Sequence, residues 1–242
     1  MPRGSRRAIP PGRAIPRVRA PDRARAEDAL RAFLDALGFD PADVELRDTP
    51  TRVTRAFIEV LTAGYAQDGL GVLGSGFTSQ HRGSVVSTRI PLVFTCPHHL
   101  MMAHGQAHLA FLPNGKIPGL ARLFRLVDAM SHRLILQEDL THEISDALRE
   151  MLSATAAVVV IEAKHGCIAV EDLARKDTII RTTSSFGARR NVESLQHEID
   201  VTLFEPWKTS ASDAPSPSHG SKSPSPSPPR PAVRRKRRTN SK

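Results

Sequence analysis

The sequence predicts an α+β domain in which helices pack on one face of an antiparallel sheet. Three observations favour this fold class. Two helical patterns come first, a pair of short β-type runs follows between residues 85 and 112, and two more helical patterns precede two further strands. The chain has 242 residues, of which 40% are apolar, and this is enough for a hydrophobic core.

The two N-terminal helices are indicated by apolar spacing and by end signals. Residues 27–37 place apolar side chains at helical intervals, and Gly38 ends the pattern. Asp48 is a candidate helix cap, and Pro50 occupies a position that the first helical turn tolerates. The second helix is therefore expected to run from this cap to Leu61.

The strands and the remaining helices follow in order. Residues 84–94 and 106–112 are rich in β-branched and apolar side chains, and a Pro-Asn-Gly turn closes the second run. The elements predicted after this hairpin are helices at 120–134 and 140–152 and strands at 157–170 and 178–186.

Positive charge is concentrated at the two ends of the chain. The formal net charge is +9, with +7 in residues 1–25 and +8 in residues 207–242, so residues 26–206 carry −6. The Arg/Pro-rich first segment and the Pro/Ser-rich last segment are predicted to be disordered basic tails on either side of one folded domain. Because that domain is acidic and poor in aromatic residues, it is not expected to bind nucleic acid, except weakly through the tails.

The composition also bears on location. No apolar run approaches the ~18 residues of a membrane span, and no secretory signal is indicated, so a cytoplasmic protein is expected. In a reducing compartment, two cysteines are more typical of metal ligands, nucleophiles or core residues than of a disulfide. Three alternatives stay open for the tails: a transit peptide at the start, and a nuclear-import signal or a polyanion contact at residues 234–238.

Both cysteines lie close to histidines. Cys96 and His99 stand three residues apart after a predicted strand, and His165 and Cys167 stand two apart within another, so the latter pair is expected on one sheet face. Two thiolates and one imidazole suit Zn²⁺, and three protein ligands leave a coordination position for water. Zinc lowers the pKa of that water to about 7, and His98 and His165 could carry protons beside it.

A structural interpretation of the same residues stays open at this point. Free cysteine is among the most buried residue types, and a single Cys-x-x-His is a weak metal pattern. The histidines without such partners are predicted to be surface or structural residues, namely His104, His108, His132, His142 and His197.

Taken together, the segments DTPTRV, CPHHL, HGQAHLAFLPNGK, GLARLFRLV, LQEDLT and IEAKHGC resemble the GTP cyclohydrolase I family, over residues 26–186 or somewhat beyond. The resemblance implies the tunnelling fold, a homodecamer of two stacked pentamers, active sites between subunits and a catalytic zinc ion. The site residues that it implies are the metal ligands Cys96, His99 and Cys167 and the catalytic histidines His98 and His165.

The resemblance also implies the substrate and the reaction. Members of this family open the five-membered ring of GTP at C8, release formate and form 7,8-dihydroneopterin triphosphate, the first step of folate and related pterin synthesis. Glu138 matches the guanine-recognising residue, because a carboxylate can accept hydrogen bonds from N1 and N2 together, and Gln137 before it is expected among the substrate-binding residues. Arg122 and Arg125, which follow Leu120 at a helix start, match the triphosphate-binding cations. Without the family, these residues are an ordinary helix start and a solvated helix face.

Four positions depart from the family pattern. Pro97 stands where Glu is usual, Ala121 where Ser is usual and Arg122 where Lys is usual. Glu171 replaces an Arg that faces the triphosphate, and its carboxylate would repel phosphate by about 1 kcal/mol or more, unless Arg175 compensates. These departures leave two alternatives: an enzyme for another purine nucleotide, or a regulatory or scaffold paralogue whose tails bind polyanions.

Overall fold

The computed structural model describes residues 18–204, apart from the side chains of residues 69 and 70. Most of the two predicted tails lies outside the described residues. The end of the predicted N-terminal tail is the exception, because the first helix begins at Arg23. This part of the chain contains α1 (Arg23–Ala36) and α2 (Thr49–Ala56), and α2 continues into a π-helical turn, η1 (Phe57–Leu61). Both helices that the sequence predicts before the sheet are therefore present.

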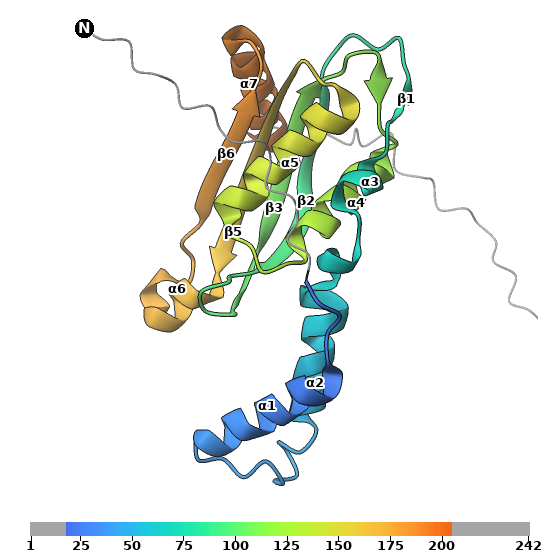
Figure 1. The fold of residues 1–242 in the computed structure, drawn as a ribbon. Coiled ribbons are helices and arrows are strands. Elements are labelled where there is room, and N and C mark those ends of the chain that lie inside the picture. The colour runs from blue at the N-terminus through green and yellow to red at the C-terminus, as the bar shows by residue number, and fades with distance from the viewer. Residues whose placement is uncertain (1–17, 205–242) are drawn as a thin grey trace, which may run out of the picture. The chain divides into compact units, whose positions relative to one another are not determined.

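A four-stranded antiparallel sheet forms the centre of the domain (Figure 1). Its strand order is β2-β3-β5-β6, with β2 at Val85–Thr95, β3 at Met102–Leu112, β5 at Ala156–His165 and β6 at Ile180–Phe186. A smaller sheet pairs β1 (Phe77–Thr78) with β4 (Lys116–Ile117). The predicted α+β class with an antiparallel sheet is confirmed.

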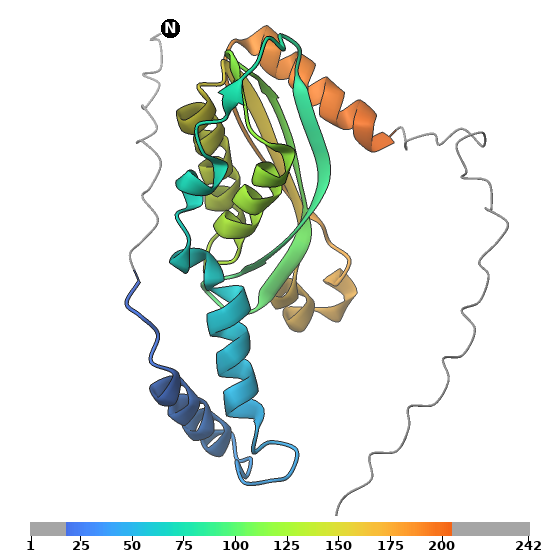
Figure 2. The same ribbon diagram turned by 90° about the vertical axis from the view of Figure 1, so that its right-hand side faces the viewer.

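Helices α4 (Leu120–Ser131) and α5 (Gln137–Leu152) cover one face of the large sheet, as the side view shows (Figure 2). Their apolar stripes and the inward residues of the strands form one continuous core. Its fully buried members include Phe94, Leu109, Phe111, Leu126, Ile144, Leu148 and Ile161. This layer matches the predicted packing of helices on one face of the sheet.

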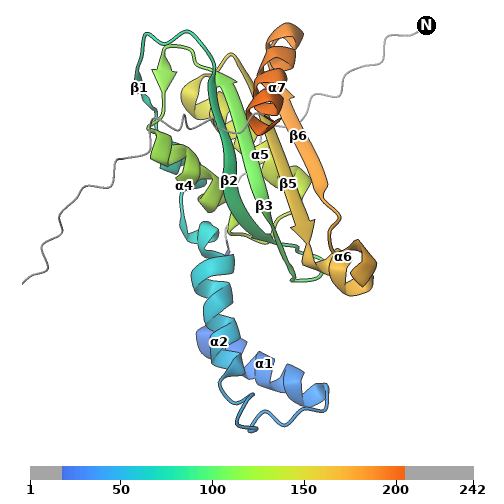
Figure 3. The same ribbon diagram turned by 180° about the vertical axis from the view of Figure 1, so that it is seen from behind.

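A further helix, α7 (Arg189–Phe204), lies against the opposite face of the sheet, seen from behind in Figure 3. Leu195 and Ile199 are its buried residues, and they pack with Val158 and Val160 of β5 in a second, smaller core. This helix was not predicted from the sequence, because its apolar stripe is narrow and most of its residues are polar.

The strand predicted at 157–170 ends earlier than expected. β5 stops at His165, and Gly166–Glu171 form the short helix α6. A Cβ atom at Gly166 would come within 2.9 Å of a β3 carbonyl oxygen, so the chain passes β3 too closely for a larger residue. The prediction that His165 and Cys167 leave one face of the same strand is therefore wrong, because Cys167 lies in a helical turn.

Three short helical segments complete the described part of the chain and were not predicted: η2 (Ala63–Ala66), α3 (Gly69–Leu73) and η3 (Leu173–Arg175). Within residues 18–204, every helix is too short or too polar to cross a membrane.

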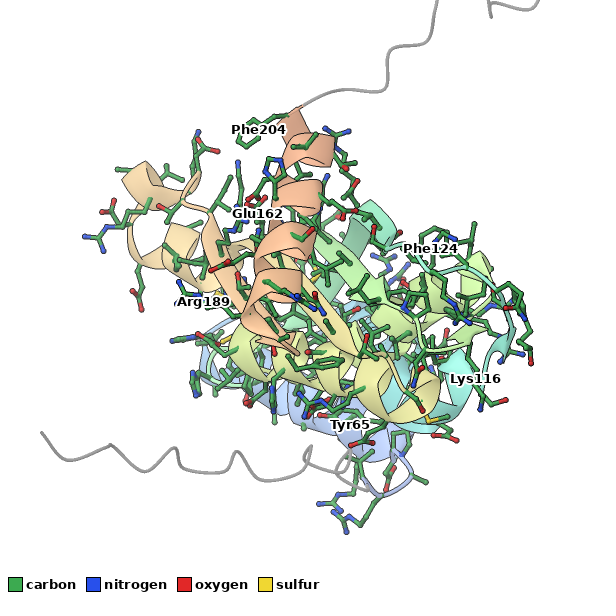
Figure 4. The ribbon with its side chains drawn as sticks, turned by 90° about the horizontal axis from the view of Figure 1, so that it is seen from above. Tyr65, Lys116, Phe124, Glu162, Arg189 and Phe204 are labelled. Carbon is green, nitrogen blue, oxygen red and sulfur yellow. The ribbon has the colours of Figure 1, made fainter. Side chains whose placement is uncertain are left out.

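A polar cluster that begins at one buried histidine links α7 to the sheet. His108 on β3 is fully buried, and its Nδ1 accepts a hydrogen bond from the Arg89 backbone N–H at 3.1 Å. The neutral ring therefore carries its proton on Nε2, which lies 3.8 Å from Glu162 Oε2. Arg181 bridges Glu162 and Asp200 of α7, with 3.2 Å to each. Figure 4 labels Glu162 and shows it beside α7. Burial lowers the pKa of His108; Glu162 opposes this shift, and Arg181 and Arg89 add to it.

This cluster predicts that the free energy of unfolding falls in acid. His108 has a lower pKa when folded than its ordinary 6.5, so as the pH drops below about 6.5 the unfolded chain takes up a proton first. The contribution of His108 to the free energy of unfolding is fully present above that pH. Below it, this contribution declines by at most about 1.4 kcal/mol per pH unit. Urea unfolding between pH 7.5 and 5, at fixed protein concentration, measures the slope.

The variant His108→Gln should flatten this acid slope, because an amide oxygen can still accept from the Arg89 N–H but does not take up a proton. His104→Gln is the control, since His104 is an exposed residue of the same strand. An unchanged slope in His108→Gln, or an equal flattening in both variants, would contradict the assignment.

Candidate metal and catalytic site

The candidate site lies where β2 and β5 end on either side of β3, at the end of the sheet beside α6 (Figure 1). Thr95, the last residue of β2, pairs with Met102, and His165, the last residue of β5, pairs with Ala103. The residues that follow β2 and β5 therefore emerge next to each other, although they are some seventy positions apart in the sequence. Cys96 follows β2 directly.

A tight loop shapes the connection from β2 to β3. The Cys96 N–H donates to Met101 O and the Leu100 N–H donates to Cys96 O, both at 2.9 Å. Leu100 has a φ of 55°, which turns the chain back into β3. The loop buries Cys96 and leaves His98 and His99 exposed.

The structure brings Cys96, His99 and Cys167 together. Their ligand atoms all lie within 4.8 Å of one another, and Cys96 Sγ is 3.7 Å from His99 Nδ1. Zn–S and Zn–N bonds of about 2.3 and 2.1 Å at a tetrahedral angle place S and N about 3.6 Å apart. The separation of Cys96 and His99 matches that of two ligands on one zinc ion, and Cys167 lies within reach of the same position. A fourth position would then be open to water.

Cys96 affects the protonation of the Cys167 thiol. Burial raises the pKa of the Cys167 thiol, and the neighbouring Cys96 raises it further. A pair of thiolates at this separation is unfavourable without a positive charge between them, and a divalent cation would supply that charge and displace the thiol protons. The donor chemistry therefore suits a metal ion.

His165 stands beside this group. Its ring meets Phe94 edge-on, with 5.5 Å between the ring centroids, and its Nε2 lies 2.8 Å from Gln137 Oε1. Burial lowers the pKa of His165, and the exposed carboxylate of Glu138 partly opposes this shift. His98, the other predicted catalytic histidine, stays exposed, with its ring centroid 6.2 Å from that of His99.

The predicted phosphate-binding residues are not brought to this group within one chain. Leu120, Arg122 and Arg125 are exposed on the first turns of α4. Cys96, His99 and Cys167, called the metal group from here on, lie beyond the last turn of that helix. Arg122 is about 14 Å along the helix axis from Ser131, at 1.5 Å per residue. Its guanidinium lies 3.4 Å from Val72 O, in α3.

The positions that depart from the family pattern are also exposed. Pro97 follows Cys96 in the loop, and Ala121 lies on the first turn of α4. Glu171 ends α6, one helical turn after Cys167, so a free carboxylate stands near the metal group. Arg175 pairs with Asp172 at 3.0 Å, and no ion pair of Arg175 with Glu171 is found among the described residues.

One residue that supports the end of β2 was not predicted from the sequence. Arg133 is only 1% exposed, donates to Met130 O at 2.7 Å and pairs with Glu143. Its carbonyl accepts from the Thr95 N–H at 3.2 Å, immediately before Cys96. A charged residue directly before the apolar run LIL was the available signal, since such a residue is buried only when it is paired.

Three known proteins that are similar to this chain share one family description. The family model described as GTP cyclohydrolase I matches residues 26–202. A GTP cyclohydrolase 1 of Corynebacterium aurimucosum is 42% identical over 169 residues, covering 68% of this chain and 85% of that protein. A GTP cyclohydrolase 1 of Mycobacterium marinum is 43% identical over 178 residues, covering 72% and 87%. One from Carboxydothermus hydrogenoformans is 41% identical over 159 residues, covering 65% and 82%.

The geometry predicts one tightly bound zinc ion per chain, with two thiolate ligands. Cys96→Ser and Cys167→Ser should each weaken zinc binding by more than tenfold, because a hydroxyl is a poor substitute for a thiolate. Elemental analysis after dialysis measures the zinc content, and the control His98→Ala should keep its zinc. Full zinc content in the double variant Cys96→Ser/Cys167→Ser would contradict the ligand assignment.

Proposed function

The chain belongs to the GTP cyclohydrolase I family, and we propose that it converts GTP to 7,8-dihydroneopterin triphosphate and formate, the first step of folate or related pterin synthesis. The observation that carries this proposal is the group Cys96, His99 and Cys167, with His165 beside it. Such a donor set with an open position is typical of hydrolytic zinc sites.

In this proposal Cys96, His99 and Cys167 hold Zn²⁺. When bound, zinc lowers the pKa of a coordinated water to about 7 and so supplies the nucleophile for attack on C8 of guanine. His165 and the exposed His98 are proposed to exchange protons with the ring nitrogens next to C8, which must gain protons as the ring opens. Both rings lie on segments that end at the metal group, so proton transfer to the ring nitrogens and attack on the adjacent C8 can occur in one site.

Guanine recognition is assigned to Glu138. Its carboxylate is exposed in the first turn of α5, one residue from the side chain that contacts His165. Two oxygens can accept the parallel hydrogens on guanine N1 and N2, which selects guanine over adenine. A cytoplasmic location remains the prediction made from the sequence.

The triphosphate is assigned to Arg122 and Arg125 of a second copy of the chain. Within one chain these residues lie at the other end of α4 from the metal group, which supports a site completed by a neighbouring subunit. The strand order leaves β2 and β6 with one neighbour each in the part of the chain that the structure describes. Free edges of this kind are suited to pairing with another copy, in keeping with the homodecamer implied by the family.

The activity is tested by incubating the zinc-loaded protein with GTP. We expect stoichiometric release of formate and a fluorescent pterin after oxidation, with both lost on chelation and restored by added zinc. Cys96→Ser should be inactive, which would also exclude a purely regulatory or scaffold role for the wild-type chain. Absence of pterin from a preparation of confirmed zinc content would reject the proposal.

The shared site predicts complementation between two inactive variants. Cys96→Ser loses the metal group and Arg125→Ala loses a phosphate contact, but a mixed oligomer contains some sites with both intact. If the subunits mix randomly, roughly a quarter of the sites are complete. Co-expression with two different tags and measurement of GTP turnover on the doubly purified oligomer gives this fraction. Mixed oligomers without activity would place the whole site within one chain.

Glu171 favours a second candidate substrate, a purine nucleotide with fewer phosphates. If GTP is the substrate, Glu171→Gln should lower the KM for GTP by about fivefold, since removing one repulsion near the phosphates is worth about 1 kcal/mol. The exposed Glu150, at the far end of α5, provides the control Glu150→Gln. Turnover of GTP, GDP, GMP and guanosine is compared in parallel. A higher kcat/KM for GMP or GDP than for GTP would favour the second candidate.

A further inference from the structure

Gln137 has a different set of contacts from the one expected of a guanine-binding residue. It is the first residue of α5, it is only 2% exposed, and its amide lies between β5 and β6. Its Nε2 lies 3.0 Å from Ile161 O and 2.9 Å from Ile180 O. Carbonyl oxygens only accept hydrogen bonds, so the amide nitrogen must face these two strands.

The orientation of the amide determines the state of its neighbour. With Nε2 committed to the two carbonyls, Oε1 is the atom that lies 2.8 Å from His165 Nε2. An amide oxygen is an acceptor, so His165 Nε2 must carry the hydrogen. In the neutral ring the lone pair is then on Nδ1, the nitrogen available for accepting a proton.

The surroundings hold this arrangement in place. Thr182 Oγ1 lies 3.1 Å from Gln137 Nε2 and 2.6 Å from Thr141 Oγ1, and the Thr141 hydroxyl donates to Gln137 O at 2.6 Å. Phe94 contacts the His165 ring edge-on. The ring is thus confined by a hydrogen bond and by an aromatic contact.

Direct recognition of guanine by the Gln137 side chain would break this network. Both of its polar atoms are already bonded, and a buried carbonyl or hydroxyl left without its partner costs about 1–3 kcal/mol. The next residue, Glu138, is exposed and free of such contacts in the described part of the chain. Glu138 is therefore available to bind guanine, whereas the side chain of Gln137 is committed to contacts within the protein.

We propose that Gln137 is a positioning residue, which fixes the orientation of the His165 ring and keeps its proton on Nε2 so that Nδ1 serves as the proton acceptor. This inference rests on the proposed function for its catalytic consequence, because His165 is the proposed proton carrier. The hydrogen-bond geometry itself does not depend on the substrate.

The first experiment observes the ring directly. Zinc-loaded protein labelled with [15N]histidine is studied by solid-state NMR at pH 8, and His165 is assigned by the signals missing from His165→Asn. We expect a single Nε2–H tautomer in the wild type and a mixture in Gln137→Met, which keeps the volume but removes both polar atoms. Unchanged His165 signals in Gln137→Met would overturn the inference even if the chain had no activity on GTP.

The second experiment is a double-mutant cycle with GTP. In the wild-type background, Gln137→Met should lower kcat by about 10- to 100-fold, the usual effect of removing a partner of an active-site histidine, with KM changed less than threefold. In His165→Asn the same change should lower kcat less than threefold, because the route through His165 is already lost. Equal losses in both backgrounds, or a large rise in KM with kcat retained, would overturn the inference.

Two variants complete the design. Gln137→Glu keeps an oxygen facing His165 Nε2, and its second oxygen must carry a proton to face the carbonyls of Ile161 and Ile180. In that form it should retain more of kcat and of the Nε2–H tautomer than Gln137→Met. If Gln137→Met does not fold, Gln137→Glu decides, and a mixed tautomer in it contradicts the inference. Glu138→Gln should instead raise KM and leave the His165 signals unchanged. If the wild type turns over no GTP, the proposed function fails while the NMR result still decides the role of Gln137.

Discussion

The pairing of the first residues of β3 is the constraint on which the site depends. Met102 pairs with the end of β2 and Ala103 with the end of β5, so the chain segments that follow those strands meet across one strand. A slip of one residue would turn every side chain to the other face and separate the two thiols. Gly105 permits this register, because a Cβ atom there would lie 1.9 Å from a β5 carbonyl oxygen. Backbone pairing therefore sets where the segments that carry Cys96 and Cys167 meet.

The same pairing explains why binding groups of different kinds gather at one end of the sheet. Cys96 disfavours the thiolate of the neighbouring Cys167, and a bound cation would reverse this effect. His165 ends β5, and the amide of Gln137 reaches it from the start of α5, between carbonyls of β5 and β6. The proposed metal ligands and the proposed proton carrier are thus positioned by one set of strands, and a bound metal ion would add to the stability of that end.

The sequence predicted the parts of this account that depend on local pattern. The helical spacing of α4 and α5, the β2–β3 hairpin and the proximity of Cys96 to His99 all follow from periodicity or from short spacing. It did not predict α7, whose buried stripe is narrow, or the turn that places Cys167 in α6, because that turn depends on how closely Gly166 passes β3. The contacts of Gln137 could not be predicted either, because its partners lie on β5 and β6, far from it in the sequence. The resemblance named Arg122 and Arg125, but only coordinates show how far along α4 they lie from the metal group in one chain.

We propose that two remote thiolates and one imidazole hold a zinc ion with an open position. Zinc K-edge X-ray absorption on the purified full chain reports these ligands. We expect two sulfur scatterers at about 2.3 Å and two nitrogen or oxygen scatterers at about 2.0–2.1 Å. One of the light scatterers should be replaceable by a small anion such as azide. A shell without sulfur, a shell of four protein ligands that azide does not alter, or a protein that retains no zinc would contradict the account.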